Sequence, residues 1–70
     1  MNLAKRTEFG VAIRKRLIDE DRTMTWLIEQ VRVKTGLYFD SSYLWKIEHG
    51  VCETPSIVAA IKEILEMDGG

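Results

Sequence analysis

The sequence contains few of the residues that stabilise a small domain by means other than packing. One cysteine excludes an intrachain disulfide, and with one histidine no metal site or other cofactor is expected. No apolar run approaches the roughly 20 residues that span a bilayer, and the first ten residues are too polar for a signal peptide. We therefore expect a cytoplasmic protein that makes no membrane contact and is held together by its core, with or without a partner chain.

The remaining composition is that of one small globular domain. Its 70 residues are 46% apolar and 30% charged, with a net charge of −1. The charge is unevenly distributed, because residues 1–34 hold eight basic against five acidic side chains, a net of +3, whereas residues 35–70 hold two against six, a net of −4. An anionic ligand should therefore meet the first half of the chain.

Two amphipathic segments in the first half, residues 7–21 and 23–34, predict helices. Their apolar stripes are formed by Phe9, Ile13 and Leu17 and by Met24, Leu27, Ile28 and Val31. Thr7 suits the N-cap of the first helix, and either Thr23 or Thr25 suits that of the second. The first helix should stop near the acidic run 19–21, and Gly36 should end the second.

The second half predicts two more helices. Residues 40–50, DSSYLWKIEHG, start with Asp40 as N-cap and end at Gly50, and Thr54 with Pro55 opens the next helix. The inward-facing residues are Leu44 and Ile47 in one helix and Ile57, Val58, Ile61, Ile64 and Leu65 in the other. The connector TGLYFD should be a loop whose Leu37 and Phe39 are buried.

Together these segments predict an all-α fold, a bundle of four to five short helices. The domain should span residues 7–67, with a flexible N-terminus at 1–6 and a frayed C-terminus at 68–70. No second acid, nucleophile or glycine-rich phosphate loop accompanies Glu48, so no enzymatic activity is expected. We interpret Glu48 as a carboxylate that orients the turn after its helix, and Cys52 as a small, partly buried apolar group.

The exposed face of residues 40–50 carries the chemistry that points to a function. Two short helices joined by a turn, the second exposing small polar residues near its start, form the geometry of a helix-turn-helix. Ser41 and Ser42 are short enough to allow a close approach, and Lys46 can reach a guanine edge or a phosphate. A merely solvated helix face is the alternative. Trp45 beside them suits a protein partner or a wedge-like DNA contact, against simple packing.

The segment SSYLWKIEHG resembles the recognition helix and following turn of the Cro/CI-type (XRE) helix-turn-helix family, which commonly reads Ser-x-Ser-Tyr-Leu-Ser-x-Ile-Glu-x-Gly. FGVAIRKRLIDEDRTMT is similar to the first helix of the phage-borne branch of that family. The resemblance covers roughly residues 7–66. It implies a lambda-repressor-like helix-turn-helix domain, encoded by a phage or mobile element, that binds operator DNA and forms a homodimer.

The resemblance also implies roles for individual residues. Ser41, Ser42 and Lys46 match positions that contact bases, while Tyr43 matches one that contacts the DNA backbone or supports the helix. Trp45 matches an outward-facing position. Further contacts to the DNA backbone are expected from Thr25, Arg14, Lys15, Arg22, Arg32 and Lys34. The expected function is a transcriptional regulator that occupies a short palindromic operator and blocks a promoter, although activator and excision-factor roles fit the same surface.

Three departures from the family pattern support an alternative function. The connector KTGLYFD is about four residues longer than the usual turn, Trp26 replaces a glutamine that usually begins the second helix and clamps a phosphate, and Glu53 stands where a basic residue is frequent. The alternative is an interaction protein with the same fold, for example an anti-repressor that docks on a repressor through Trp45, Tyr38 and Phe39.

Overall fold

The computed structural model describes residues 5–67, and within that range the chain forms four helices and no strand. These are α1 (Glu8–Asp19), α2 (Met24–Thr35), α3 (Ser41–Glu48) and α4 (Pro55–Ile64). The predicted all-α fold of short helices is thereby confirmed. Most of the predicted flexible N-terminus, residues 1–4, and the predicted frayed end, residues 68–70, lie outside the described residues.

Polar side chains at the predicted positions begin the first three helices. The Thr7 hydroxyl accepts the Gly10 N–H at 3.1 Å, and the Asp40 carboxylate accepts the Tyr43 N–H at 2.9 Å. Thr23, rather than Thr25, caps α2, because its hydroxyl accepts the backbone N–H of Trp26, three residues further along, at 3.0 Å. The starts of α1, α2 and α3 therefore each have one of their unpaired N–H groups satisfied by the residue before the helix.

The start of α4 differs from the prediction in one respect. Thr54 occupies the N-cap position and Pro55 the first helical position, as expected. The Thr54 hydroxyl, however, makes no cap bond and lies 2.6 Å from the Tyr43 hydroxyl of α3. Thr54 thus connects two helices instead of satisfying the end of its own.

The connector between α2 and α3 is only partly buried. Gly36 ends α2 in the left-handed conformation, with φ at 70°, and its N–H donates to the Arg32 carbonyl at 2.8 Å. Phe39 is buried with 1% of its surface exposed, as predicted, but Leu37 is 45% exposed, so its predicted burial is wrong. The Leu37 N–H donates to the Thr35 hydroxyl at 3.1 Å, which keeps this residue beside the end of α2 and outside the core.

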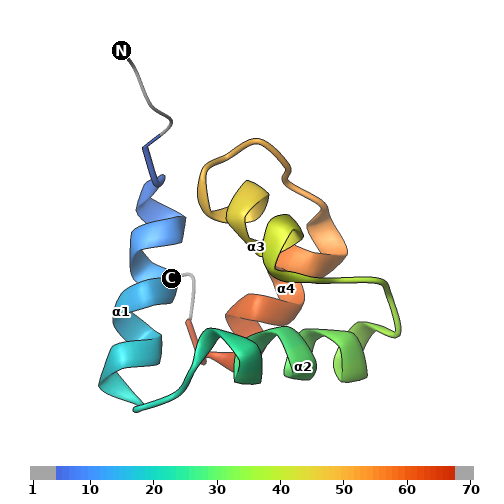
Figure 1. The fold of residues 1–70 in the computed structure, drawn as a ribbon, viewed down its shortest axis with the longest axis horizontal. Coiled ribbons are helices and arrows are strands. Elements are labelled where there is room, and N and C mark those ends of the chain that lie inside the picture. Colours follow the sequence, from blue (N-terminus) through green and yellow to red (C-terminus); the bar gives the residue numbers. More distant parts are fainter. Residues whose placement is uncertain (1–4, 68–70) are drawn as a thin grey trace.

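One apolar core joins all four helices. In the view of Figure 1, α2 crosses beneath α3 and α4, while α1 stands beside them. The core residues are Ile13, Leu17, Leu27, Val31, Phe39, Leu44, Ile47, Ile57, Ile61 and Leu65. The predicted apolar stripes therefore face a common interior. Within residues 5–67, none of the helices has the length and apolar character needed to cross a membrane.

Candidate nucleic-acid interface

The short helix α3 divides its side chains between the core and one open face. Leu44, Ile47 and Glu48 are buried, whereas Ser41, Ser42, Trp45 and Lys46 are exposed. Because a helix repeats every 3.6 residues, these four exposed positions share one side of α3. The hydroxyls of both serines and the amine of Lys46 make no side-chain hydrogen bond or ion pair with the described residues, and so remain available to a ligand.

The start of α3 is held by an acid whose two oxygens are both occupied. One oxygen of Asp40 accepts a hydrogen bond from the Tyr43 N–H, and the other accepts one from the Tyr38 hydroxyl. These bonds, the one from Tyr38 first, lower the pKa of Asp40 below its ordinary value. The same contact raises the pKa of Tyr38. Asp40 is therefore an ionised but engaged group at the edge of the open face.

Tyr43 connects α3 to the connector before it and to the start of α4. Its ring packs against Phe39 of the connector, with centroids 5.0 Å apart and planes tilted by 47°. Its hydroxyl bonds with the Thr54 hydroxyl at 2.6 Å, at the start of α4. Of the two roles that the sequence leaves open for Tyr43, contact with the DNA backbone or support of the helix, these contacts favour support.

The end of α3 is joined to the start of α1 through backbone atoms. The Glu48 carbonyl accepts both the Thr7 N–H at 2.9 Å and the Thr7 hydroxyl at 3.1 Å. Gly10 lies directly on this carbonyl, because a Cβ placed on Gly10 would stand 2.9 Å from the Glu48 Cα. Only a residue without a side chain permits this approach of the two helices.

The carboxylate of Glu48 is fully buried and neutralised by α1. Arg14 donates to it from Nε at 2.7 Å and from Nη2 at 3.3 Å, and the Nε of Arg6 lies 3.7 Å away. Such paired donation from one guanidinium is a strong, geometrically specific contact. The interpretation of Glu48 as a residue that orients the following turn is therefore wrong, because its side chain points toward α1 instead.

Sequence reasoning missed this ion pair, although a signal for it was present. Glu48 follows Leu44 by four residues, so it lies on the inward stripe of its helix, where an acid needs a partner. The partner could not be found in the same way, because Arg14 lies 34 positions earlier. Arg6 belongs to the segment predicted as flexible, yet it reaches the same carboxylate.

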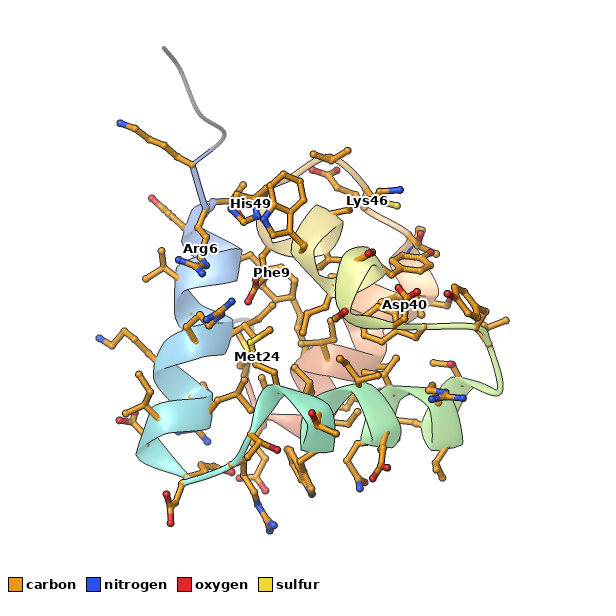
Figure 2. The ribbon with its side chains drawn as sticks, in the orientation of Figure 1. Arg6, Phe9, Met24, Asp40, Lys46 and His49 are labelled. Carbon is orange, nitrogen blue, oxygen red and sulfur yellow. The ribbon has the colours of Figure 1, made fainter. Side chains whose placement is uncertain are left out.

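Trp45 is stacked on His49, one turn further along the chain. The ring centroids are 4.0 Å apart and the planes differ by 18°. The His49 Nδ1 lies 2.8 Å from the Trp45 carbonyl oxygen, a hydrogen bond that fixes the imidazole. Figure 2 shows His49 at the end of α3 that faces Arg6 and α1, with Lys46 and Asp40 lying away from α1. The sequence predicts the outward position of Trp45 but not this stacked geometry.

Three of the residues expected to contact the DNA backbone have partners within the protein. Arg14 is engaged by Glu48, Arg22 lies over the Trp26 ring at 4.5 Å, and Lys34 pairs with Glu63 of α4 at 2.9 Å. The others, Lys15 on α1 and Thr25 and Arg32 on α2, are exposed. Within the described part of the chain, Arg14 and the unpredicted Arg6 are the cations that pair with Glu48 of α3.

Met24 and Thr25 open α2, as the resemblance to the phage-borne branch of the family implies for this Met-Thr pair. Because Thr23 caps the helix, Met24 is its first residue and Trp26 its third. Met24 packs against the core, and Figure 2 shows it on the side of α2 that faces α1 and α3. Trp26 therefore does not begin the helix, and its ring pairs with the Arg22 guanidinium instead.

A hollow of about 410 Å³ runs along the side of α3, lined by Tyr38, Asp40, Ser42, Tyr43, Lys46 and Cys52. Cys52 is half-buried, in agreement with the sequence interpretation, and its Sγ lies 3.6 Å from the Thr54 hydroxyl. Within the described part of the chain no three histidine, cysteine or acidic side chains are grouped as metal ligands. Because Ser42 and Lys46 line the hollow, it is continuous with the polar face of α3.

Two further findings bear on the function. Phe39 is buried, so it is not part of a docking surface with Trp45 and Tyr38, and that part of the alternative hypothesis is wrong. Comparisons of the chain with protein-family models, with curated proteins and with solved structures found no match.

Proposed function

We propose that this protein is a sequence-specific DNA-binding transcriptional regulator whose helix α3 enters the major groove. The observation that carries the proposal is the open face of α3, which presents two hydroxyls and one amine away from the core. These groups suit hydrogen bonds to base edges. Of the two acids in residues 40–50, Glu48 is buried beside Arg14 and presents no free charge to a phosphate, whereas Asp40 stays ionised at the edge of the face, with both oxygens hydrogen-bonded.

The long connector before α3 is compatible with this role. The additional residues include Phe39, which packs in the core, and Asp40, which caps α3. The connector therefore holds the helix at one end, while the Thr7 and Gly10 contacts with Glu48 hold it at the other. A helix fixed at both ends is preorganised, which lowers the entropic cost of binding.

As a regulator, the protein would act in the cytoplasm by covering an operator and blocking a promoter. Two copies on a palindromic site would place two α3 helices about 34 Å apart, one turn of the duplex. The apolar side chains of Ile57, Ile61 and Leu65 are buried in the protein's own core, so a second copy must pack on another surface than this stripe of α4. Sedimentation with and without a short duplex measures the stoichiometry.

A duplex selected by the protein from a random library provides the direct test. Anisotropy titrations between about 50 and about 200 mM salt should show log K falling linearly with log salt, by about 0.9 for each phosphate contacted. Lys46→Ala should weaken binding, whereas the matched control Lys62→Ala removes an equal charge from α4 and should change it little. Affinity that is independent of salt, or equal losses in both variants, would contradict the proposal.

The alternative is an interaction protein that binds another regulator through Trp45 and Tyr38. This reading is favoured by their exposure, 45% and 73%. A folded chain, verified by circular dichroism, that enriches no duplex from the library would favour this second function over the first.

A further inference from the structure

One side chain on the open face of α3 is explained by neither charge nor hydrogen bonding. Trp45 has 45% of its surface exposed, although its neighbours on this face, Ser42 and Lys46, are polar. Exposed indole surface is unfavourable in water and commonly marks a contact site. Because Trp45 shares a side of α3 with the serines and the lysine, whatever contacts them also meets the indole.

The indole of Trp45 is held in one orientation by the imidazole of His49. His49 covers one ring face, with centroids 4.0 Å apart, and its Nδ1 is bonded to the Trp45 carbonyl oxygen at 2.8 Å. The exposed fraction of Trp45 therefore belongs to the opposite ring face and to the ring edge. A ring that is fixed before binding loses little conformational entropy when it is covered.

We propose that Trp45 determines sequence specificity by packing on the 5-methyl group of a thymine in the major groove, with His49 as its positioning residue. The inference rests on the proposed function. The thymine methyl is the apolar group that the major groove offers, and the other base-edge groups there are donors and acceptors. The exposed side of α3 combines the same two kinds of group, because Ser41, Ser42 and Lys46 are polar and Trp45 is apolar.

The position of Trp45 specifies which thymine is read. It follows Ser41 by four residues and directly precedes Lys46, so along α3 it lies one turn beyond the leading serines. A thymine next to the base contacted by Lys46 is therefore the expected target. The surrounding polar face favours DNA over a protein partner, since the centre of a protein–protein contact is depleted of charge.

Single thymine-to-deoxyuridine replacements in the selected duplex test the proposal, because they remove only the methyl group. For the unmodified protein, one replacement in one half-site should weaken binding by about fourfold, as expected for the loss of one buried methyl. In Trp45→Ala the overall affinity should fall and the difference between thymine and uracil should vanish. In the control Lys46→Ala the affinity should fall while the thymine-to-uracil ratio is retained.

His49 variants distinguish positioning from a merely structural role. His49→Phe keeps a stacked ring and should retain most of the thymine-to-uracil ratio, whereas His49→Ala should reduce it without a comparable loss of thermal stability. Uracil tolerated at every position, or an unchanged ratio in Trp45→Ala, would overturn the inference and assign the exposed indole to another contact, such as a protein partner. If the wild-type protein enriches no duplex, the proposed function itself fails. If it enriches a duplex but the thymine-to-uracil ratio is unchanged in Trp45→Ala, only the inference about Trp45 fails.

Discussion

Replacing Gly10 with alanine tests the contact that fixes α3 against α1. An alanine Cβ at this position would lie 2.9 Å from both the carbonyl carbon and the Cα of Glu48, closer than such atoms approach in real proteins. The obstructing atoms belong to the backbone, so no side-chain rotation relieves the overlap. The two helices must move apart, and the two bonds from Thr7 to the Glu48 carbonyl lengthen.

The cost can be worked out from opposing contributions. Alanine gains about 1 kcal/mol over glycine from helix propensity. Overpacking against rigid atoms costs up to about 3 kcal/mol, and weakening two hydrogen bonds costs about 1 kcal/mol in total. The net loss for Gly10→Ala is therefore about 3 kcal/mol. In a domain of this size 1 kcal/mol shifts Tm by roughly 4–8 °C, so we expect a decrease of about 15 °C.

Thermal and urea denaturation followed by circular dichroism measure this loss. Gly36→Ala is the matched control, because the added methyl there meets no atom within 4 Å and only the φ of 70° opposes it. We expect that control to cost about 1 kcal/mol, the penalty for a left-handed alanine. A Gly10→Ala protein as stable as the wild type would show that the two helices are not in tight contact and would refute the reasoning.

Three further predictions concern side chains around α3. Arg14→Ala leaves the buried Glu48 with fewer donors and should cost about 2 kcal/mol in urea denaturation, less than for a fully buried pair because Arg14 is 37% exposed; no loss would contradict the ion pair. Asp40 has a lowered pKa, so its stabilisation is present above about pH 4 and is lost as pH falls through the lower folded value. The Tm difference between wild type and Asp40→Ala should therefore shrink below about pH 4. Tyr38→Phe should raise the pKa of Asp40 toward its ordinary value in an NMR titration, and an unchanged pKa would exclude the Tyr38 bond as its main cause.

Local features of the sequence predicted the helices because each depends on neighbouring residues. Thr7 and Asp40 each lie shortly before an apolar stripe, and both cap their helices. The periodicity did not choose between Thr23 and Thr25, since the two threonines flank Met24, the first residue of the stripe, and the choice depends on where the chain enters the helix. The burial of Leu37 was predicted wrongly because hydropathy alone does not show that the turn at Gly36 holds it outside.

Parts of the candidate site that depend on distant residues could not be predicted in this way. The pairing of Arg14 with Glu48 and that of Tyr43 with Thr54 depend on how the helices pack. By contrast, the four exposed positions on α3 followed from helical spacing alone, because Leu44 and Ile47 define the inward side. The chemistry of the face was thus available from the sequence, while the contacts that fix its orientation required the fold.

The attachment of α3 by its two ends has an evolutionary consequence. Caps and backbone contacts hold the helix, so positions 41, 42, 45 and 46 contribute little to the core and can accept other residues. A library randomised at these four codons should yield mostly folded proteins, among which new targets can be selected. The same separation would let related chains diverge in what they recognise while their architecture is inherited unchanged.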